Sequence, residues 1–147
     1  MVIHSTCQAM MMHDSPSAES ISILETRDIV LARGAARSLA ASLGFSLADQ
    51  TRLATAVSEL SRNALHYAGS GVCEITNISN EGERRIRVVV VDHGPGIPVI
   101  ERALQDGYST GGGLGAGLPG TRRLMDVFHI ESAPGLTRVH VELVRRK

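Results

Sequence analysis

Two polar residues four positions apart, Glu59 and Asn63, lie within the stretch ELSRN at 59–63, where apolar residues recur at helical spacing. Residues at i and i+4 of a helix share one face, about one turn apart. A carboxylate can take a proton from a hydroxyl group or water, and a carboxamide oxygen suits Mg²⁺, which prefers oxygen ligands. Taken alone, the pair also fits an ordinary polar helix face, which is the commoner case. Arg62, between them, is expected to be solvated.

A second group of residues is Val91-Asp92-His93-Gly94-Pro95-Gly96. An aspartate that ends an apolar strand points into a crevice, where its oxygens can accept a hydrogen bond from an amino group such as that of adenine. Gly94 and Gly96 would let the backbone pass close to a flat ring because they have no Cβ. The alternative is a strand followed by an ordinary Gly/Pro turn. His93 is expected to be a turn residue.

The third feature is STGGGLGAGLPG at 109–120, which holds six of the 15 glycines of the chain. Successive glycine N–H groups that lead into a helix N-terminus form a cradle for an anion, and such a loop can also act as a lid. The letters match G-x-G-x-x-G at 115–120 and G-x-S-x-G at 107–111. Both of those motifs require a preceding apolar strand, which is missing here. A phosphate lid remains the better interpretation.

The elements that must position these residues follow from hydrophobic spacing and turn signals. We expect strands at 20–25, 72–78, 84–92, 128–132 and 137–144, and helices at 27–43, 46–67, 98–104 and 118–127. Residues 1–19 show no periodicity and are expected to be a disordered tail before one domain at 20–147. The predicted fold class is α+β, a two-layer sandwich with a mixed sheet and the helices on one face.

Composition and the pattern of apolar residues argue against several kinds of partner and against a membrane-spanning or exported protein. The 15 acidic and 15 basic residues cancel, so neither nucleic acid nor an anionic membrane is expected as a partner. Cys7 and Cys73 fit a reducing compartment better than a disulfide framework. No apolar run approaches the length of a membrane span, and the start lacks the pattern of a signal peptide. A cytoplasmic protein is expected.

The order of the three features is more specific than any one of them. Glu-x-x-x-Asn, then Asp-x-Gly-x-Gly, then Gly-x-Gly-Leu-Gly-x-Gly-Leu resembles the N, G1 and G2 boxes of the GHKL (Bergerat-fold) ATP-binding superfamily. Within it, the chain from residue 20 onward resembles the RsbT-type serine/threonine kinases, switch proteins of bacterial stressosome pathways. The closer match lies in AVSELSRNALHYAG (56–69), VDHGPGIP (91–98) and DGYSTGGGLGAGLPGTRRLMD (106–126).

The resemblance implies roles for individual residues. Glu59 would be the general base, Asn63 the Mg²⁺ ligand, and Asp92 the reader of the adenine amino group. The late Gly-x-Gly-Thr of the superfamily is matched only in part by Ala133-Pro134-Gly135-Leu136-Thr137, so Thr137 is a weaker match. The full set of implied nucleotide-binding residues is Asn63, Asp92, Gly94, Gly96, Ile97, Gly111, Gly112, Gly113, Leu114, Gly115, Ala116, Gly117, Leu118 and Thr137.

The resemblance also implies a function. The chain would use ATP and Mg²⁺ to phosphorylate a Ser or Thr of a STAS-domain antagonist protein and, when released, would activate a PP2C-type phosphatase or related effector. The sequence shows no phosphoacceptor-histidine domain and no second domain, so a stand-alone kinase is expected. Two alternatives are an anti-sigma factor kinase of the SpoIIAB or RsbW type and a nucleotide-dependent binding module without catalysis. The presence of Glu59 favours a catalytic function over a pure binding module, because a binding module needs no general base.

Overall fold

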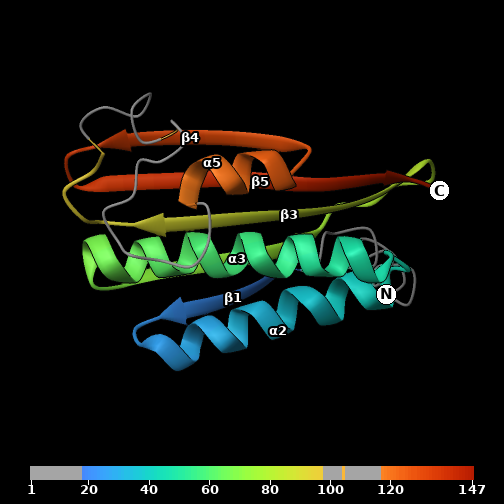
Figure 1. The fold of residues 1–147 in the computed structure, drawn as a ribbon, viewed down its shortest axis with the longest axis horizontal. Helices are drawn as coiled ribbons and strands as arrows, with labels where there is room; N and C mark the ends of the chain where they lie inside the picture. The colour runs from blue at the N-terminus through green and yellow to red at the C-terminus, as the bar shows by residue number, and fades with distance from the viewer. Residues whose placement is uncertain (1–17, 98–103, 105–116) are drawn as a thin grey trace, which may run out of the picture.

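The computed structural model describes residues 18–97, 104 and 117–147. Three helices and five strands follow one another along this part of the chain (Figure 1). In chain order they are β1 (Ala18–Ile23), α2 (Thr26–Ser42), α3 (Leu47–Ala68), β2 (Gly71–Asn77), β3 (Glu83–Asp92), α5 (Gly117–Leu124), β4 (Val127–Ala133) and β5 (Leu136–Arg146). Apart from residue 104, the predicted helix at 98–104 lies outside the described residues.

The five strands form one sheet in the order β1-β2-β3-β5-β4. All three helices lie against the same face of it, which confirms the predicted α+β class and its two layers (Figure 1). The prediction of a mixed sheet is wrong, because all four strand pairings among the described residues are antiparallel. β4 runs in the same direction as β3, but the tight β4–β5 hairpin inserts β5 between them.

Local signals explain where the elements begin and end. The Oγ of Ser46, the first residue of the predicted helix at 46–67, accepts a hydrogen bond from the backbone N–H of Asp49 at 3.1 Å and thereby caps α3. Gly69 ends α3 with a left-handed φ of 79°. α5 ends before the predicted residue 127, because Val127 pairs with Glu142 in the β4–β5 ladder. β1 begins at residue 18, two residues before the predicted strand, and the remainder of the predicted tail lies outside the described residues.

The core between the layers is aliphatic and follows the two periodicities of helix and strand. Leu53, Val57 and Leu60 of α3 are buried at helical spacing. They lie in one hydrophobic cluster with Ile86 and Val88, alternate residues of β3. Because α3 is fixed on the sheet by this stripe, the neighbouring face of the same helix is held next to the ends of β3 and β5.

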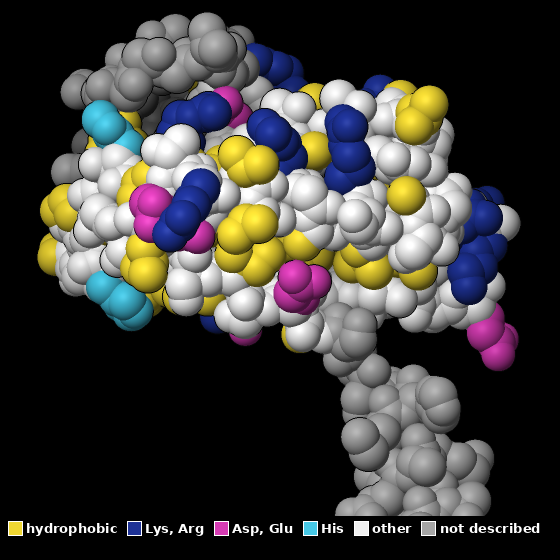
Figure 2. Space-filling view, turned by 90° about the horizontal axis from the view of Figure 1, so that it is seen from below, with side chains coloured by type: hydrophobic (Ala, Val, Ile, Leu, Met, Phe, Trp, Pro, Cys, Tyr) yellow, Lys and Arg dark blue, Asp and Glu magenta, His cyan; other side chains and the backbone are white. Residues whose placement is uncertain are grey.

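The outer side of α2 carries apolar side chains that the core does not cover. Val30 and Leu31 of α2 are exposed, as is Leu24 just before it, and Arg27 and Arg37 lie on the same helix. Figure 2, which looks from below Figure 1 toward this side, shows hydrophobic side chains separated by Lys and Arg side chains. Singly exposed apolar residues are common on protein surfaces, so this face by itself identifies no partner.

A buried hydroxyl on α3 gives a first prediction. The Oγ of Ser61 is fully buried and makes no hydrogen bond to a nitrogen or oxygen atom within the described part of the chain; the Cys73 thiol, a weak hydrogen-bonding group, lies beside it. A buried polar atom without a partner costs free energy, so Ser61→Ala should raise the free energy of unfolding by about 1 kcal/mol. Ser58→Ala is the matched control, because the Ser58 hydroxyl donates to the Ala54 carbonyl at 2.9 Å. Urea unfolding of both variants tests this, and a loss of stability in Ser61→Ala would contradict it.

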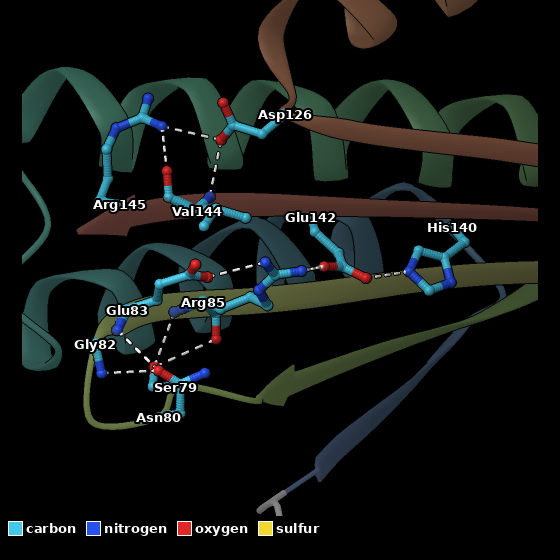
Figure 3. Close-up of polar contacts among 10 residues, drawn as sticks. All are labelled: Ser79, Asn80, Gly82, Glu83, Arg85, Asp126, His140, Glu142, Val144 and Arg145. Carbon is cyan, nitrogen blue, oxygen red and sulfur yellow. Dashed lines mark hydrogen bonds and ion pairs between the residues drawn. The ribbon is translucent and has the colours of Figure 1, made fainter.

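Charged networks close the end of the sheet where β5 finishes (Figure 3). On the uncovered face, Arg85 bridges Glu83 and Glu142, and Glu142 also contacts His140 at 2.6 Å. Burial opposes ionisation of Glu142, but the hydrogen bonds from His140 and Arg85 outweigh it and lower the pKa of that carboxyl. On the helix-covered side, Arg145 donates to Asp126. These charges are paired within the chain.

Arg145 also anchors α3 to the sheet through Asp49. Its Nε and Nη2 donate to the two oxygens of Asp49 at 2.9 and 2.8 Å, and Asp49 is buried. The hydrogen bonds from Arg145 hold the pKa of Asp49 below its ordinary value of 3.8. A lowered folded-state pKa contributes stability that is present above the unfolded-state pKa and is lost as the pH falls through the folded-state pKa.

This ion pair predicts a specific acid dependence. Asp49→Asn should lower the free energy of unfolding by about 1–2 kcal/mol at pH 7, because the charged hydrogen bonds are lost. The difference from the unmodified protein should shrink as the pH falls from about 4 toward 2, where Asp49 itself becomes protonated. Denaturant unfolding at several pH values measures this difference. A difference that stays constant with pH would show that the carboxylate charge is not the cause.

Candidate nucleotide-binding site

A pocket lies between α3, the ends of β3 and β5, and the start of α5. It contains about 450 Å³ of empty space, counting the part that opens to solvent. The lining residues are Leu60, Asn63, Ala64, Tyr67, Val90, Asp92, Gly96, Ile97, Leu118, Thr137 and Val139. Most of them are apolar, with a few polar groups among them, which is the usual make-up of a site for a flat organic ligand.

The structure brings together six residues that the sequence analysis singled out, from segments far apart in the chain. Those that line the pocket are Asn63, Asp92, Gly96, Ile97, Leu118 and Thr137. Asp92 and Thr137 meet because they are direct partners in the β3–β5 ladder. The remaining loop residues are Gly111, Gly112, Gly113, Leu114, Gly115 and Ala116, and these lie outside the described residues.

Asp92, the last residue of β3, offers the pocket a carboxylate oxygen. The side chain is buried, and its Oδ1 accepts a hydrogen bond from the backbone N–H of Gly94 at 3.0 Å. Oδ2 has no partner among the described residues. Burial raises the pKa of Asp92, and the Gly94 N–H and the nearby His93 act in the opposite direction. A half-satisfied buried carboxyl group in a pocket is suited to accept a hydrogen bond from a ligand.

Asn63 lies on the pocket side of α3, half-buried. Its carboxamide has no hydrogen-bond partner in the part of the chain that the structure describes, so its oxygen can bind a ligand or a metal ion. Within residues 18–97, 104 and 117–147, there is no group of three or more His, Cys, Asp or Glu side chains that could hold a metal ion. Mg²⁺ commonly takes only one or two protein ligands and completes its shell with phosphate oxygens and water, so Asn63 fits this use.

Glu59 lies one turn before Asn63 on α3 and is not among the residues that line the pocket. It is buried, and its Oε1 accepts a hydrogen bond from Arg62 Nη1 at 2.7 Å. Arg62, expected to be solvated, is half-exposed, and it also pairs with Glu59. The other carboxylate oxygen of Glu59 has no partner within the described residues and can take a proton.

The glycines after β3 are required by contacts within the protein as well as by the pocket. A Cβ on Gly94 would lie 2.6 Å from the Cβ of Ala68 at the end of α3. Gly96 has φ +83°, and a Cβ there would lie 2.5 Å from the carbonyl oxygen of Ala133. These distances are too short for any side chain. The segment therefore packs tightly between α3 and the β4–β5 hairpin, and this fixes one wall of the pocket.

The N-terminus of α5 lies at the pocket, because Leu118 in its first turn lines it. Gly117 has a left-handed φ of 64°, and its carbonyl accepts a hydrogen bond from Thr121 Oγ1 at 3.1 Å. Pro119 is buried in the same turn, where its missing N–H costs nothing. The free N–H groups at a helix N-terminus favour an anion such as phosphate.

Several residues of the site were not identified from the sequence. Leu60 and Tyr67 lie three residues before and four residues after Asn63, and Ala64 lies four residues after Leu60, so i+3 and i+4 spacing would have found them. Strand alternation would likewise have placed Val90 and Val139 two residues from Asp92 and Thr137. Ser132, whose hydroxyl contacts Thr137, has no such signal, because its place depends on the β4–β5 register.

Comparisons with known proteins identify the family of the chain. The family described as histidine kinase-, DNA gyrase B-, and HSP90-like ATPase matches residues 48–147. Serine/threonine-protein kinase RsbT of Bacillus subtilis (strain 168) is 47% identical over 115 residues, which cover 78% of this chain and 86% of that protein. Among the described helices, none has an apolar stretch long enough to span a bilayer.

Solved structures share the fold at low sequence identity. The mycobacterial sensor histidine kinase MprB aligns with a TM-score of 0.51 at 19% identity, over 89% of this chain and 100% of that one. The histidine kinase domain of the blue-light activated histidine kinase from Erythrobacter litoralis EL346 gives a TM-score of 0.50 at 21% identity. That alignment covers 80% of this chain and 59% of that one. At these identities the likeness concerns the fold alone.

The family match supports an ATP-binding domain over residues 48–147, and the identity to RsbT extends over most of both chains. The predicted class of enzyme, a protein serine/threonine kinase that uses ATP, is thereby confirmed. The chain belongs to the histidine kinase-, DNA gyrase B-, and HSP90-like ATPase family and, within it, to the RsbT-type serine/threonine-protein kinases.

Proposed function

We propose that this chain transfers the γ-phosphoryl group of ATP to a serine or threonine of a STAS-domain antagonist protein in a bacterial partner-switching pathway. One observation carries the proposal. Asn63 lines the pocket, and Glu59 lies one helical turn away with one carboxylate oxygen that no described residue contacts. This arrangement supports a role of Glu59 as proton acceptor and of Asn63 as ligand of a phosphate-bound Mg²⁺, in a chain related to a serine/threonine kinase.

The pocket residues suggest how ATP is bound. Adenine would enter the apolar space, with its amino group at Asp92 and its ring against Ile97 and Thr137. The phosphates would lie toward Asn63 and the N-terminus of α5. The residues proposed to cover them are Gly111, Gly112, Gly113, Leu114, Gly115, Ala116, Gly117 and Leu118. A lid of this kind would exclude water from the reacting phosphate.

The chemical step then needs positioning and one proton transfer. The acceptor hydroxyl oxygen forms a bond to the γ-phosphorus, the bond from that phosphorus to the bridging oxygen breaks, and ADP leaves. The hydroxyl proton passes to Glu59, which is held in place by Arg62. Bound Mg²⁺ would neutralise part of the phosphate charge, with Asn63 as its protein ligand.

The proposed output is a switch of partners. Phosphorylation of the STAS-domain antagonist would release the kinase, which would then bind and activate a PP2C-type phosphatase. An anti-sigma factor kinase would hold a sigma factor in place of that phosphatase, and a pure binding module would use nucleotide only to hold its shape.

A transfer assay tests the proposal. The protein is incubated with Mg²⁺, γ-labelled ATP and the STAS-domain protein encoded nearest to it, and phosphoamino acid analysis follows. Label on serine or threonine of the STAS-domain protein is expected. ATP binding without any transfer would support the binding module, and retention of a sigma factor in a pull-down, with no retention of a PP2C phosphatase, would support the anti-sigma factor kinase.

A further inference from the structure

The segment after β3 is hydrogen-bonded to the β4–β5 hairpin at one edge of the pocket. The backbone N–H of Ile97 donates to Ser132 Oγ at 2.7 Å. The N–H of Gly135 donates to the Gly94 carbonyl at 2.9 Å, and His93 Nδ1 lies 3.3 Å from the Gly135 carbonyl. Of these contacts, only the one at Ser132 is made by a side chain of the hairpin. A substitution of Ser132 therefore removes this hydrogen bond from Ile97 without altering the backbone.

Ser132 also contacts a residue that lines the pocket. Its Oγ lies 2.8 Å from Thr137 Oγ1, and the two residues are direct partners in the β4–β5 ladder. Thr137 is in turn the β3–β5 partner of Asp92. The three side chains therefore form one row across neighbouring strands, on the helix-covered face of the sheet. Asp92 and Thr137 line the pocket, and Ser132 stands behind Thr137.

The hydrogen-bond capacity of a hydroxyl group decides the direction of the bond between Ser132 and Thr137. A hydroxyl has one proton to donate and two positions that accept. Ser132 already accepts from Ile97. If Thr137 also donated to it, the proton of Ser132 would have no acceptor among the described residues. If Ser132 donates to Thr137, Ser132 both accepts and donates a hydrogen bond. The hydroxyl proton of Thr137 can then be donated to a ligand in the pocket.

We propose that Ser132 is a positioning residue for nucleotide recognition, which fixes the Thr137 hydroxyl as a hydrogen-bond donor toward the pocket, beside the acceptor Asp92. An acceptor next to a donor matches the edge of adenine, whose amino group donates and whose ring nitrogen N1 accepts. This inference rests on the proposed ATP site. Ser132 does not itself line the pocket, but it sets the orientation of the Thr137 hydroxyl, which does.

The test compares ATP with 1-deaza-ATP, which lacks the N1 acceptor, by calorimetry in the full chain. The unmodified protein should bind ATP about 5- to 10-fold more tightly, the size of one hydrogen bond. Ser132→Ala should reduce this preference to about 2-fold or less, because Thr137 is then free to rotate its proton away. Ser132→Thr, which keeps a hydroxyl group, should restore the preference.

Ser79→Ala is a matched control, because Ser79 Oγ accepts the N–H of Arg85 at 2.9 Å in the β2–β3 turn (Figure 3) and Ser79 is not among the residues that line the pocket. It should leave the preference unchanged. A full preference for ATP in a folded Ser132→Ala, checked by thermal unfolding, would overturn the role of Ser132 while leaving the ATP site intact. Equal binding of the two nucleotides by the unmodified protein would also overturn it. Binding of neither would overturn the proposed function together with this inference.

Discussion

Replacement of Glu59 by alanine should abolish phosphoryl transfer while leaving ATP binding nearly unchanged. A general base typically contributes about 10²- to 10⁴-fold to a reaction rate, and it acts only in the chemical step. Glu59 does not line the pocket, so its removal takes no contact from the part that would hold adenine. Its partner Arg62 is half-exposed and can be solvated once the carboxylate is gone. Transfer is measured with labelled ATP, and binding by calorimetry.

Glu59→Gln separates the chemical role of this residue from a structural one. Glutamine keeps the size of the side chain and an oxygen that can accept the hydrogen bond from Arg62, but it cannot take a proton. The proposed role predicts the same loss of transfer as in Glu59→Ala. Normal transfer by the glutamine variant, or an equal loss of binding and transfer in both variants, would mean that Glu59 supports the structure of α3.

Asp92→Asn should weaken ATP binding about 5- to 150-fold, or about 1–3 kcal/mol. In the native protein Oδ1 is occupied by the N–H of Gly94, and Oδ2 is free for the ligand. Asparagine can keep the first contact with its oxygen, but its NH₂ group then takes the place of Oδ2. A donor would face the amino group of adenine, so the bond would be lost and two donors would oppose one another.

Calorimetric titration with ATP measures this change, and Asp126→Asn serves as its control. Asp126 accepts the N–H of Val144 and a hydrogen bond from Arg145, at the end of the sheet where β5 finishes (Figure 3). Its replacement should lower stability and leave the affinity for ATP unchanged. Unchanged affinity in Asp92→Asn would remove this residue from the site.

The sequence predicted those parts of the molecule that depend on local signals. The apolar spacing of Leu53, Val57 and Leu60 and the cap at Ser46 were enough to place α3, and with it Glu59 and Asn63. The sheet order was not predictable in this way. The insertion of β5 between β3 and β4 depends on long-range pairing, which no local pattern encodes.

The site shows the same division between local and long-range information. The strand-ending position of Asp92 was readable from the sequence, and its neighbour Thr137 was implied only by a partial family motif. The contact of Ser132 with Thr137 depends on the β4–β5 register, which no local pattern shows. The pairing of Arg62 with Glu59 is an i, i+3 contact on one helix, which helical spacing could have predicted. Pocket residues whose position follows from the strand or helix they lie on were predictable, and contacts between distant segments were not.

A crystal structure of the chain with Mg²⁺ and a non-hydrolysable ATP analogue tests the central claim most directly. The proposed function predicts adenine between α3 and the ends of β3 and β5, with its amino group within hydrogen-bonding distance of Asp92. The metal ion should bind Asn63, and the γ-phosphate should be nearest to Glu59. Nucleotide bound elsewhere, or in the pocket with its phosphates turned away from Asn63 and α5, would contradict the assignment of this pocket as the active site.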